Sequence, residues 1–470
     1  MEYQLLKTEQ KALEINLNTT IYGTFAEIGA GQEVARNFFQ AGAAANTIAK
    51  TMSAYDKTYS DAIYGSEASG RYVCESRVYK MLDHEWQLLD ERLKAVKPTA
   101  TFFAFSDSVT TINYSKTVNG QGWLGIRFQL VPGEEPNEIV VHTKLLDNDT
   151  KLQQEAVGVL GVNLLYAVYY LNHDPKQLVK SLHDGLRGRL NVDHIRLTGP
   201  NFNHVDNRLL VFYLVKYGLT ELAIFDENHM GVHASEILYK KSLMVVRGHF
   251  KPPTLVTLDV FKSGFEQFLL EPNVHEEKSM IMAELTLDYL RSYSTELDEE
   301  DFLQRADLLN LLGYKVIVSD CTNHQMMINY MSDHKIQNLG LVIGVRELLD
   351  IINEKYYENR DGRLLVAFGE LFTRNIKIFA YPALDKEKNN TLTAYNLPVP
   401  EGISFLYKHL INAQQIVEID HYNPDLLKIL PQNILEEIKK GSDVWKQGVP
   451  DIIYQTIVEK GYFNFKKQEN

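Results

Sequence analysis

Between residues 193 and 381, short apolar segments alternate with segments of helical character, and this alternation constrains the fold more than any other feature of the sequence. The predicted strands are 194–197, 221–225, 243–247, 280–287, 315–319, 340–344 and 377–381, and predicted helices at 206–216, 234–240, 301–312 and 346–357 separate most of them. Repeated strand–helix units predict an α/β fold with a mainly parallel sheet. The strand number suits a barrel or an open doubly wound sheet, and we slightly favour a barrel-like arrangement.

The flanking regions differ from this central pattern. Residues 1–100 look mostly helical, with an amphipathic helix expected over 72–96. A buried strand at 101–105 and a hairpin of strands 123–130 and 138–144 follow. We therefore expect three parts: a mostly helical N-terminal region at 1–100, an α/β domain at 101–382, and a linker with a helical C-terminal extension at 383–470.

Charge and cysteine content limit the partners and the compartment. The 61 acidic and 48 basic residues give a formal net charge of -13, which disfavours nucleic-acid binding. Two cysteines, Cys74 and Cys321, are too few for a disulfide framework. We see no secretion signal at the start of the sequence, and the longest apolar stretch, 157–171, is interrupted by an Asn and predicts a buried helix. We expect a soluble, cytoplasmic protein that does not span a membrane.

Two glycines flank one residue at the predicted start of a helix, at Gly29 and Gly31. Such a turn lets backbone N–H groups approach a phosphate or a ribose, with the helix dipole assisting. Val34 stands at the third glycine position of the dinucleotide-binding fingerprint. A plain tight turn or close helix packing explains the same glycines and is the favoured interpretation.

Charged residues stand where predicted strands end. Asp107, Asp226 and Asp320 each end or follow a strand, and Glu284 lies within the predicted strand 280–287. In parallel α/β folds the C-terminal ends of the strands converge on the ligand site, where carboxylates hold a metal ion, a ribose or a cationic group. Arg247, at the end of another strand, is a candidate for contact with an anion. The alternative is that the aspartates are turn or helix-capping residues.

Two further polar groups are weaker candidates. His229 and His233 are four residues apart with Asp226 close by, a spacing that would suit a metal on a helix, although Gly231 between them indicates a loop. The loop at 198–208 offers Asn203, His204 and Arg208 to a polar ligand, with helix capping by Asp206 as the favoured alternative.

Three segments, 20–64, 199–210 and 236–252, carry a resemblance to a known family. They resemble a family of bacterial proteins, found notably in Bacteroidetes, whose members are named nicotinate-nucleotide adenylyltransferase or TonB-dependent receptor. The first name implies a Gly-Thr-Phe start followed by a His-x-Gly-His element that binds the triphosphate. Gly23-Thr24-Phe25 matches the start, but Gly29 and Gln32 stand at the positions of the two histidines. The second name implies a secretion signal and many alternating strands, which the sequence lacks.

Two hypotheses about function follow. In the first, the chain binds or acts on a nucleotide or a phosphorylated metabolite at the C-terminal ends of its strands. In the second, it is a non-catalytic, self-assembling scaffold whose terminal helical regions join copies. A homo-oligomer is expected under either hypothesis. The candidate ligand-binding residues are Gly29, Gly31, Asp107, Asp226, Arg247 and Asp320.

Overall fold

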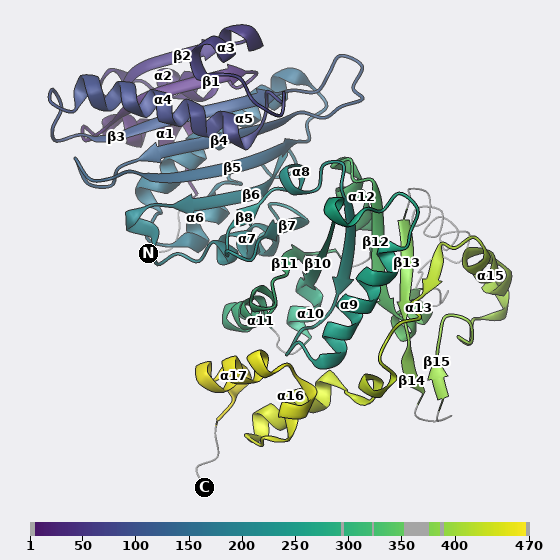
Figure 1. Ribbon diagram of the computed structural model, residues 1–470. Coiled ribbons are helices and arrows are strands. Elements are labelled where there is room, and N and C mark those ends of the chain that lie inside the picture. The colour runs from purple at the N-terminus through teal and green to yellow at the C-terminus, as the bar shows by residue number, and fades with distance from the viewer. Residues whose placement is uncertain (1–4, 293–295, 322–323, 352–375, 386–389, 467–470) are drawn as a thin grey trace. The chain divides into compact units, whose positions relative to one another are not determined.

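The computed structural model describes residues 5–292, 296–321, 324–351, 376–385 and 390–466. It has the predicted mixed α/β architecture, divided into two compact units (Figure 1). The first unit comprises Met1–Ala223 with Met230–His233, and the second comprises Ile224–His229 with Ala234–Asn470. Neither of the predicted boundaries, at residues 100 and 382, coincides with this division.

The first unit is built on a mixed sheet of six strands in the order β2-β1-β3-β4-β5-β6. Strand β1 pairs in parallel with β2 and β3, whereas β3, β4, β5 and β6 pair with one another in antiparallel fashion. The predicted hairpin is therefore confirmed as β4 and β5. The predicted strand 194–197 belongs to β6 of this antiparallel part and not to the parallel sheet. The strands are β1 Ile21–Gly29, β2 Ile48–Ala54, β3 Thr101–Thr110, β4 Gln121–Phe128, β5 Asn137–Leu145 and β6 Leu190–Thr198.

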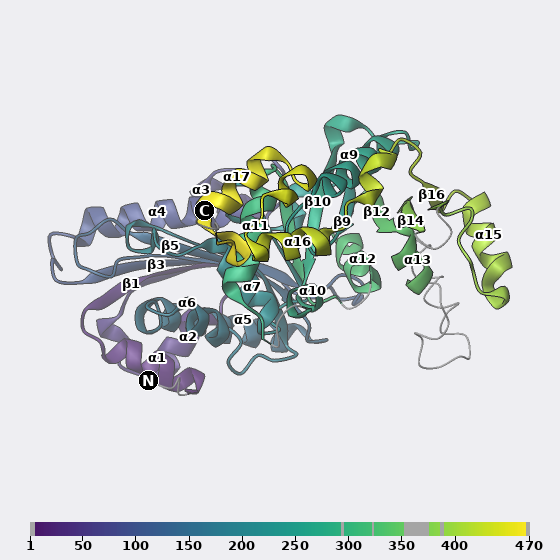
Figure 2. The ribbon, with the colours of Figure 1, turned by 90° about the horizontal axis from the view of Figure 1, so that it is seen from below.

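Helices cover both faces of this sheet (Figure 2). Helix α4 (Glu75–Leu93) packs on one face against β3 and β4, and α3 (Lys57–Tyr64) contacts α4. Helix α5 lies on the other face as the predicted buried helix, with a largely apolar sequence that packs against α1, α2 and α6. The helices of this group are α1 Thr8–Leu17, α2 Val34–Ala41, α5 Thr150–Tyr170, α6 Pro175–Ser181 and α7 Asn207–Lys216.

Strands β1 and β2 lie within the first hundred residues, beside the helices that were expected there. Gly23 makes β1 look like a poor strand, yet the packing requires glycine there, because a Cβ atom on Gly23 would lie 2.2 Å from the carbonyl oxygen of Phe103. Strand β2 lies at the edge of the sheet, and its burial alternates along its length. The distant partner β3 thus decides the conformation of this segment.

The second unit is built on a sheet in the order β16-β13-β12-β9-β10-β11-β7. The pairs β13–β16, β12–β13, β9–β12, β9–β10 and β10–β11 are all parallel. Strands β10 and β11 lie on one side of β9, and the later strands β12, β13 and β16 lie on the other side. The described sheet is therefore open and doubly wound. The slight preference for a barrel was wrong. The strands are β7 Leu222–Phe225, β9 Ser242–Arg247, β10 Ser279–Thr286, β11 Lys315–Ser319, β12 Asn338–Gly344, β13 Ile376–Tyr381 and β16 Ile416–Glu418.

Helices connect these strands and form the C-terminal extension. The predicted helix 346–357 begins as α13, and its residues 352–357 lie outside the described residues. Residues 383–470 contain α15, α16 and α17, as well as strand β16, which joins the sheet. A cluster around the buried Trp445 packs the C-terminal helices onto Leu308 of α11. Among the described residues, no helix combines the length and the apolar character that a membrane crossing requires. The main helices are α9 Leu255–Leu269, α10 Leu287–Arg291, α11 Glu299–Leu311, α12 His324–Asp333, α13 Val345–Ile351, α15 Ser404–Asn412, α16 Pro431–Lys440 and α17 Asp451–Lys460.

Candidate functional site

The strand order of the second unit places a topological switch point between β9 and β12. From β9 the chain proceeds to β10 and β11 on one side, and then to β12, β13 and β16 on the other. This is the order of a doubly wound dinucleotide-binding sheet, in which ligands bind beyond the C-terminal ends of the strands where the order reverses. The residues that follow β9, β10, β11 and β12 are therefore the first candidates for a site.

A buried charge pair lies at the C-terminal end of β9. Arg247 and Glu284 are neighbours in register on β9 and β10, and the Arg247 side chain lies with Nε 2.8 Å from Glu284 Oε2 and Nη2 3.0 Å from Oε1. Ser319 of β11 donates its hydroxyl to Glu284 Oε1 at 2.6 Å. Burial alone would lower the pKa of Arg247, but the charge of Glu284 raises it above its usual value. The pair cross-links β9 and β10 as a fixed dipole at the switch point.

An aromatic and acidic cluster continues from this pair, with one residue from the segment after each of four strands. The ring of His249, which follows β9, stacks on Tyr289 of α10 with centroids 4.0 Å apart. The Tyr289 hydroxyl donates to Glu347 of α13 at 3.3 Å, and His324 of α12 lies 3.7 Å from the same carboxylate. The parallel topology thus converges these side chains in the way that the sequence analysis expected for the strand ends.

The protonation states within this cluster are set by burial and by neighbouring charges. Burial lowers the pKa of His249, and the charge of Arg305 lowers it further, so this imidazole is neutral at pH 7. Burial would raise the pKa of Glu347, but the hydrogen bond and charge of His324 hold it below its usual value. The cluster therefore presents a neutral imidazole beside an ionised carboxylate.

Two of the candidate aspartates, Asp226 and Asp320, belong to this unit and occupy different environments. Asp320 follows β11, and burial raises the pKa of its half-exposed carboxyl group, with Arg291 3.9 Å away. It lies at the same edge of the sheet as the cluster. Asp226 follows β7, and its carboxylate accepts a hydrogen bond from the backbone N–H of Asn228 at 3.0 Å. This is the turn role that was the alternative for Asp226.

In the first unit, the structure brings Gly31 and Asp107 together. Gly29 has a φ of 72°, and a Cβ atom on Gly31 would lie 2.0 Å from Asp107 Oδ1. Glu27, at the end of β1, accepts a hydrogen bond from the N–H of Val34 at 2.7 Å, so its carboxylate occupies the N-terminus of α2. The glycines therefore serve a tight turn and a close approach to Asp107, which favours the packing interpretation over a phosphate loop.

Glu27 and Asp107 form a buried pair of carboxyl groups. Asp107 Oδ1 accepts from the N–H of Ile28 at 3.3 Å, and Asp107 Oδ2 is buried with no hydrogen-bond partner among the described residues. Burial raises the pKa of Glu27 to about 7, and burial together with the charge of Glu27 raises the pKa of Asp107 well above its usual value. At neutral pH the pair therefore retains a proton. Sequence reasoning selected Asp107 but missed Glu27.

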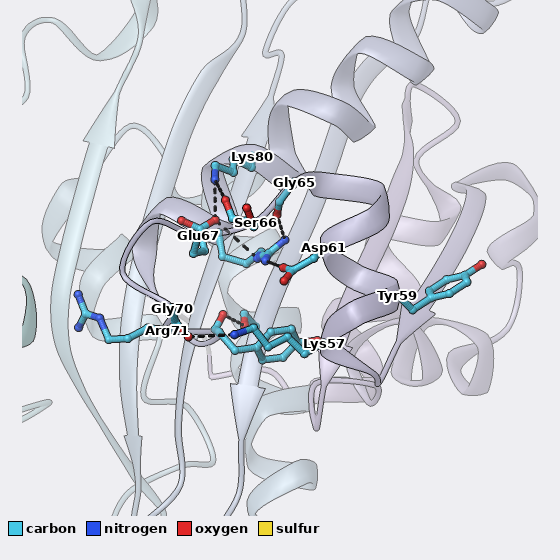
Figure 3. A network of polar contacts seen from close by, with 12 residues as sticks. Lys57, Tyr59, Asp61, Gly65, Ser66, Glu67, Gly70, Arg71 and Lys80 are labelled. Carbon is cyan, nitrogen blue, oxygen red and sulfur yellow. Dashed lines mark hydrogen bonds and ion pairs between the residues drawn. The ribbon is translucent and has the colours of Figure 1, made fainter.

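The loop between α3 and α4, residues 65–74, lies beside this turn. The ring of Tyr72 comes within 3.7 Å of a Cβ position on Gly29, and the hydroxyl of Ser108 donates to the carbonyl oxygen of Tyr72 at 3.0 Å. Polar contacts hold the loop at several points (Figure 3). Lys57 donates to the carbonyl oxygen of Gly70 at 3.1 Å, and Lys80 lies 3.0 Å from Glu67. The loop is thus fixed from both neighbouring helices.

The remaining sequence candidates have structural roles or do not come together. Asp206 caps α7 and pairs with the buried Arg208, so the capping alternative is confirmed. Asn203 and His204 are exposed, and a ligand role for them stays a prediction. His229 and His233 belong to different units, and the metal-ligating side chains close to His233 are His142 and Asp193. A shared metal role for His229 and His233 stays a prediction.

Comparisons with known proteins found no matching family model and no matching curated protein. Among solved structures, the competence/damage inducible protein CihA of Agrobacterium tumefaciens is 16% identical with a TM-score of 0.26, over 36% of this chain and 99% of that one. A nicotinic acid mononucleotide adenylyltransferase of Plasmodium falciparum is 14% identical with a TM-score of 0.31, over 48% of this chain and 98% of that one. A CinA superfamily protein of Klebsiella pneumoniae is 14% identical with a TM-score of 0.26, over 36% and 99%. With TM-scores this low, we infer nothing about function from these similarities.

Proposed function

We propose that the second unit binds a nucleotide or another phosphorylated metabolite at the C-terminal ends of β9 and β12. The observation that carries the proposal is the reversal of strand order between these two strands, with polar residues from four successive strand ends gathered beside it. A ligand at this position meets the segment after β9, which leads into α9, and the turn after β12, which leads into α13.

The chemistry of this edge suits an anionic ligand with a ring. Helix α9 is 15 residues long and begins at Leu255, directly after the segment that follows β9, so its N-terminal dipole is directed toward an anion there. Arg291 is partly exposed beside Asp320 and supplies a positive charge. The stacked rings of His249 and Tyr289 supply an aromatic surface. The opposite charges of the buried Arg247–Glu284 pair cancel, and the pair forms the base of the proposed site.

Gly344, the last residue of β12, offers a direct way to block this site. It is exposed, and a Cβ atom there would meet none of the described residues within 4 Å. A large side chain at Gly344 therefore enters the space beyond the strand ends without displacing the core. Lys278, which is exposed just before β10 at the opposite end of the sheet, is the matched position for a control.

The test is isothermal titration calorimetry of the full chain with ATP, AMP and inorganic phosphate as probes. We expect saturable binding of at least one nucleotide, a loss of affinity of about 10-fold or more in Gly344→Phe, and unchanged affinity in Lys278→Phe. Absence of binding by the unmodified chain, or equal binding by both variants, would contradict the proposal. The predicted homo-oligomer, the cytoplasmic location and the scaffold alternative stay predictions.

A further inference from the structure

Three polar side chains meet in the core of the first unit, away from both sites described above. They are His142 of β5, Asp193 of β6 and His233, which directly follows the short strand Gly231–Val232. His142 Nδ1 lies 2.6 Å from Asp193 Oδ1, and His233 Nε2 lies 3.3 Å from Asp193 Oδ2. All three residues are buried, with at most 3% of each exposed. Two imidazoles thus face the two oxygens of one carboxylate.

A β-bulge places Asp193 in this position. His142 pairs with His194, but the next residue of β5, Thr143, pairs with Val192, so Asp193 is the extra residue of β6. In a regular strand Asp193 and His194 would point to opposite faces of the sheet. The bulge redirects the carboxylate toward His142, and bulges of this kind are frequent beside functional sites.

Both ring nitrogens of His142 have polar partners. Gln121 Oε1 lies 3.2 Å from His142 Nε2, and Asp193 Oδ1 lies 2.6 Å from Nδ1. A proton on Nδ1 makes the contact with Asp193 a hydrogen bond, and a metal ion bound by both residues would replace that proton. The bond to Gln121 is also the kind of outer hydrogen bond that orients a ligating histidine.

The surroundings of the three residues are buried and aromatic. The ring of Trp123 packs against His142, His194 and His233, with centroids 4.9, 5.1 and 5.3 Å apart. A carboxylate that is ionised among these buried rings requires a cation or charged partners.

We propose that His142, Asp193 and His233 bind one divalent transition-metal ion. Two imidazole nitrogens and one carboxylate oxygen form a ligand set that suits Zn²⁺ or Fe²⁺ and disfavours Ca²⁺ and Mg²⁺. The ion joins β5, β6 and the segment that ends at His233, so it stabilises the first unit. The role is structural, because the site is enclosed in the core and presents no side chain to solvent.

The test uses the full chain, stripped with a chelator and then titrated with Zn²⁺ and, separately, with Co²⁺. We expect one Zn²⁺ per chain by elemental analysis, the visible absorption bands of nitrogen- and oxygen-coordinated Co²⁺, and a higher melting temperature with metal. Asp193→Asn and His233→Gln should lose affinity by more than the roughly 10- to 100-fold that removal of a supporting hydrogen bond costs. His194→Gln is the matched control, since His194 is also buried against Trp123 but lies outside the ligand group.

Each result of these measurements either supports the metal site or overturns it. Failure of the stripped, folded chain to bind Zn²⁺ or Co²⁺ stoichiometrically overturns the proposal, as does undiminished binding by Asp193→Asn. If the ligand variants do not fold, ¹⁵N-histidine spectra of the unmodified chain decide instead. Addition of Zn²⁺ must then shift the ring nitrogens of two histidines into the metal-bound range, and unchanged spectra refute the site.

Discussion

Glu27 and Asp107 face each other as register partners on the parallel strands β1 and β3, and both are buried. Two carboxylates so close together in a buried place cannot both ionise at low cost, so folding raises the pKa of each. The turn from Gly29 to Gly31 and the first N–H groups of α2 are built around this pair. The stability of the first unit and the structure of this turn should therefore depend on the proton that Glu27 and Asp107 retain.

The stability of the first unit should depend on pH through this pair. In the folded protein the pKa values exceed the ordinary values of 4.5 for Glu27 and 3.8 for Asp107. The stabilising contribution is therefore complete below these unfolded values and is lost as the pH rises through the folded ones, about 7 for Glu27. We expect Asp107→Asn to raise the free energy of unfolding by about 1–3 kcal/mol at about pH 8, with the gain disappearing toward about pH 5.

Urea denaturation at a series of pH values measures this difference. Glu135→Gln removes an exposed carboxylate of the same unit and serves as the control, for which we expect almost no difference at any pH. A constant difference between Asp107→Asn and the unmodified chain across the range would show that the pair does not hold the proton.

Gly31 should tolerate no side chain while Asp107 is present. The Cβ atom of Gly31→Ala would lie 2.0 Å from Asp107 Oδ1 and 2.4 Å from Cγ, so we expect a loss of about 1–3 kcal/mol in the free energy of unfolding. Asp107→Ala removes these atoms, and in the double variant the cost of Gly31→Ala should fall by about 1 kcal/mol or more. Gly344→Ala, where the described residues leave room, is the nearly neutral control. Additive effects in this cycle would mean that the two residues do not touch.

Removing one partner of the Arg247–Glu284 pair should destabilise the second unit more than removing both partners. Arg247→Met leaves Glu284 buried and uncompensated, with Ser319 as its remaining hydrogen-bond donor, and we expect a loss of about 3–5 kcal/mol. In Arg247→Met/Glu284→Leu no buried charge remains, so most of the stability should return. Chemical denaturation of the two variants checks this ordering. A single variant that is as stable as the double variant would refute it.

The parallel sheet was largely predictable because its signal is local. The apolar runs at 243–247, 280–287, 315–319, 340–344 and 377–381 correspond to mostly buried strands, and each is recognised from its own residues. The direction in which each successive strand joins the sheet leaves no comparable local signal, so the reversal at β9 that excludes a closed barrel had to come from the structure. Strand β1 was missed for a related reason, since Gly23 is required by Phe103, 80 positions along the chain.

The sites depended on pairings that one sequence does not display. Sequence reasoning selected Gly31, Asp107, Arg247 and Glu284 separately, but their contacts follow from strand register. His142 and Asp193 went unnoticed, because the segments that contain them, EIVVHTK and NVDHIRL, carry several other polar residues. The bulge that turns Asp193 toward His142 depends on how β5 and β6 pair, which has no signature in either strand alone.

The loop at 65–74 provides a last prediction, which concerns local rather than global stability. The guanidinium of Arg77 is fully buried, donates to the carbonyl oxygen of Gly65 at 2.8 Å and forms an ion pair with Asp61. Arg77→Met should leave these partners without their donor, so the loop should open more often while the sheet remains folded. We expect hydrogen exchange at residues 65–74 to accelerate about 10-fold or more, with protection of β3 and β4 unchanged. Lys57→Met removes only the exposed contact with Gly70 and should change exchange much less. Equal acceleration in the two variants, or a loss of protection throughout the unit, would show that Arg77 does not act on the loop specifically.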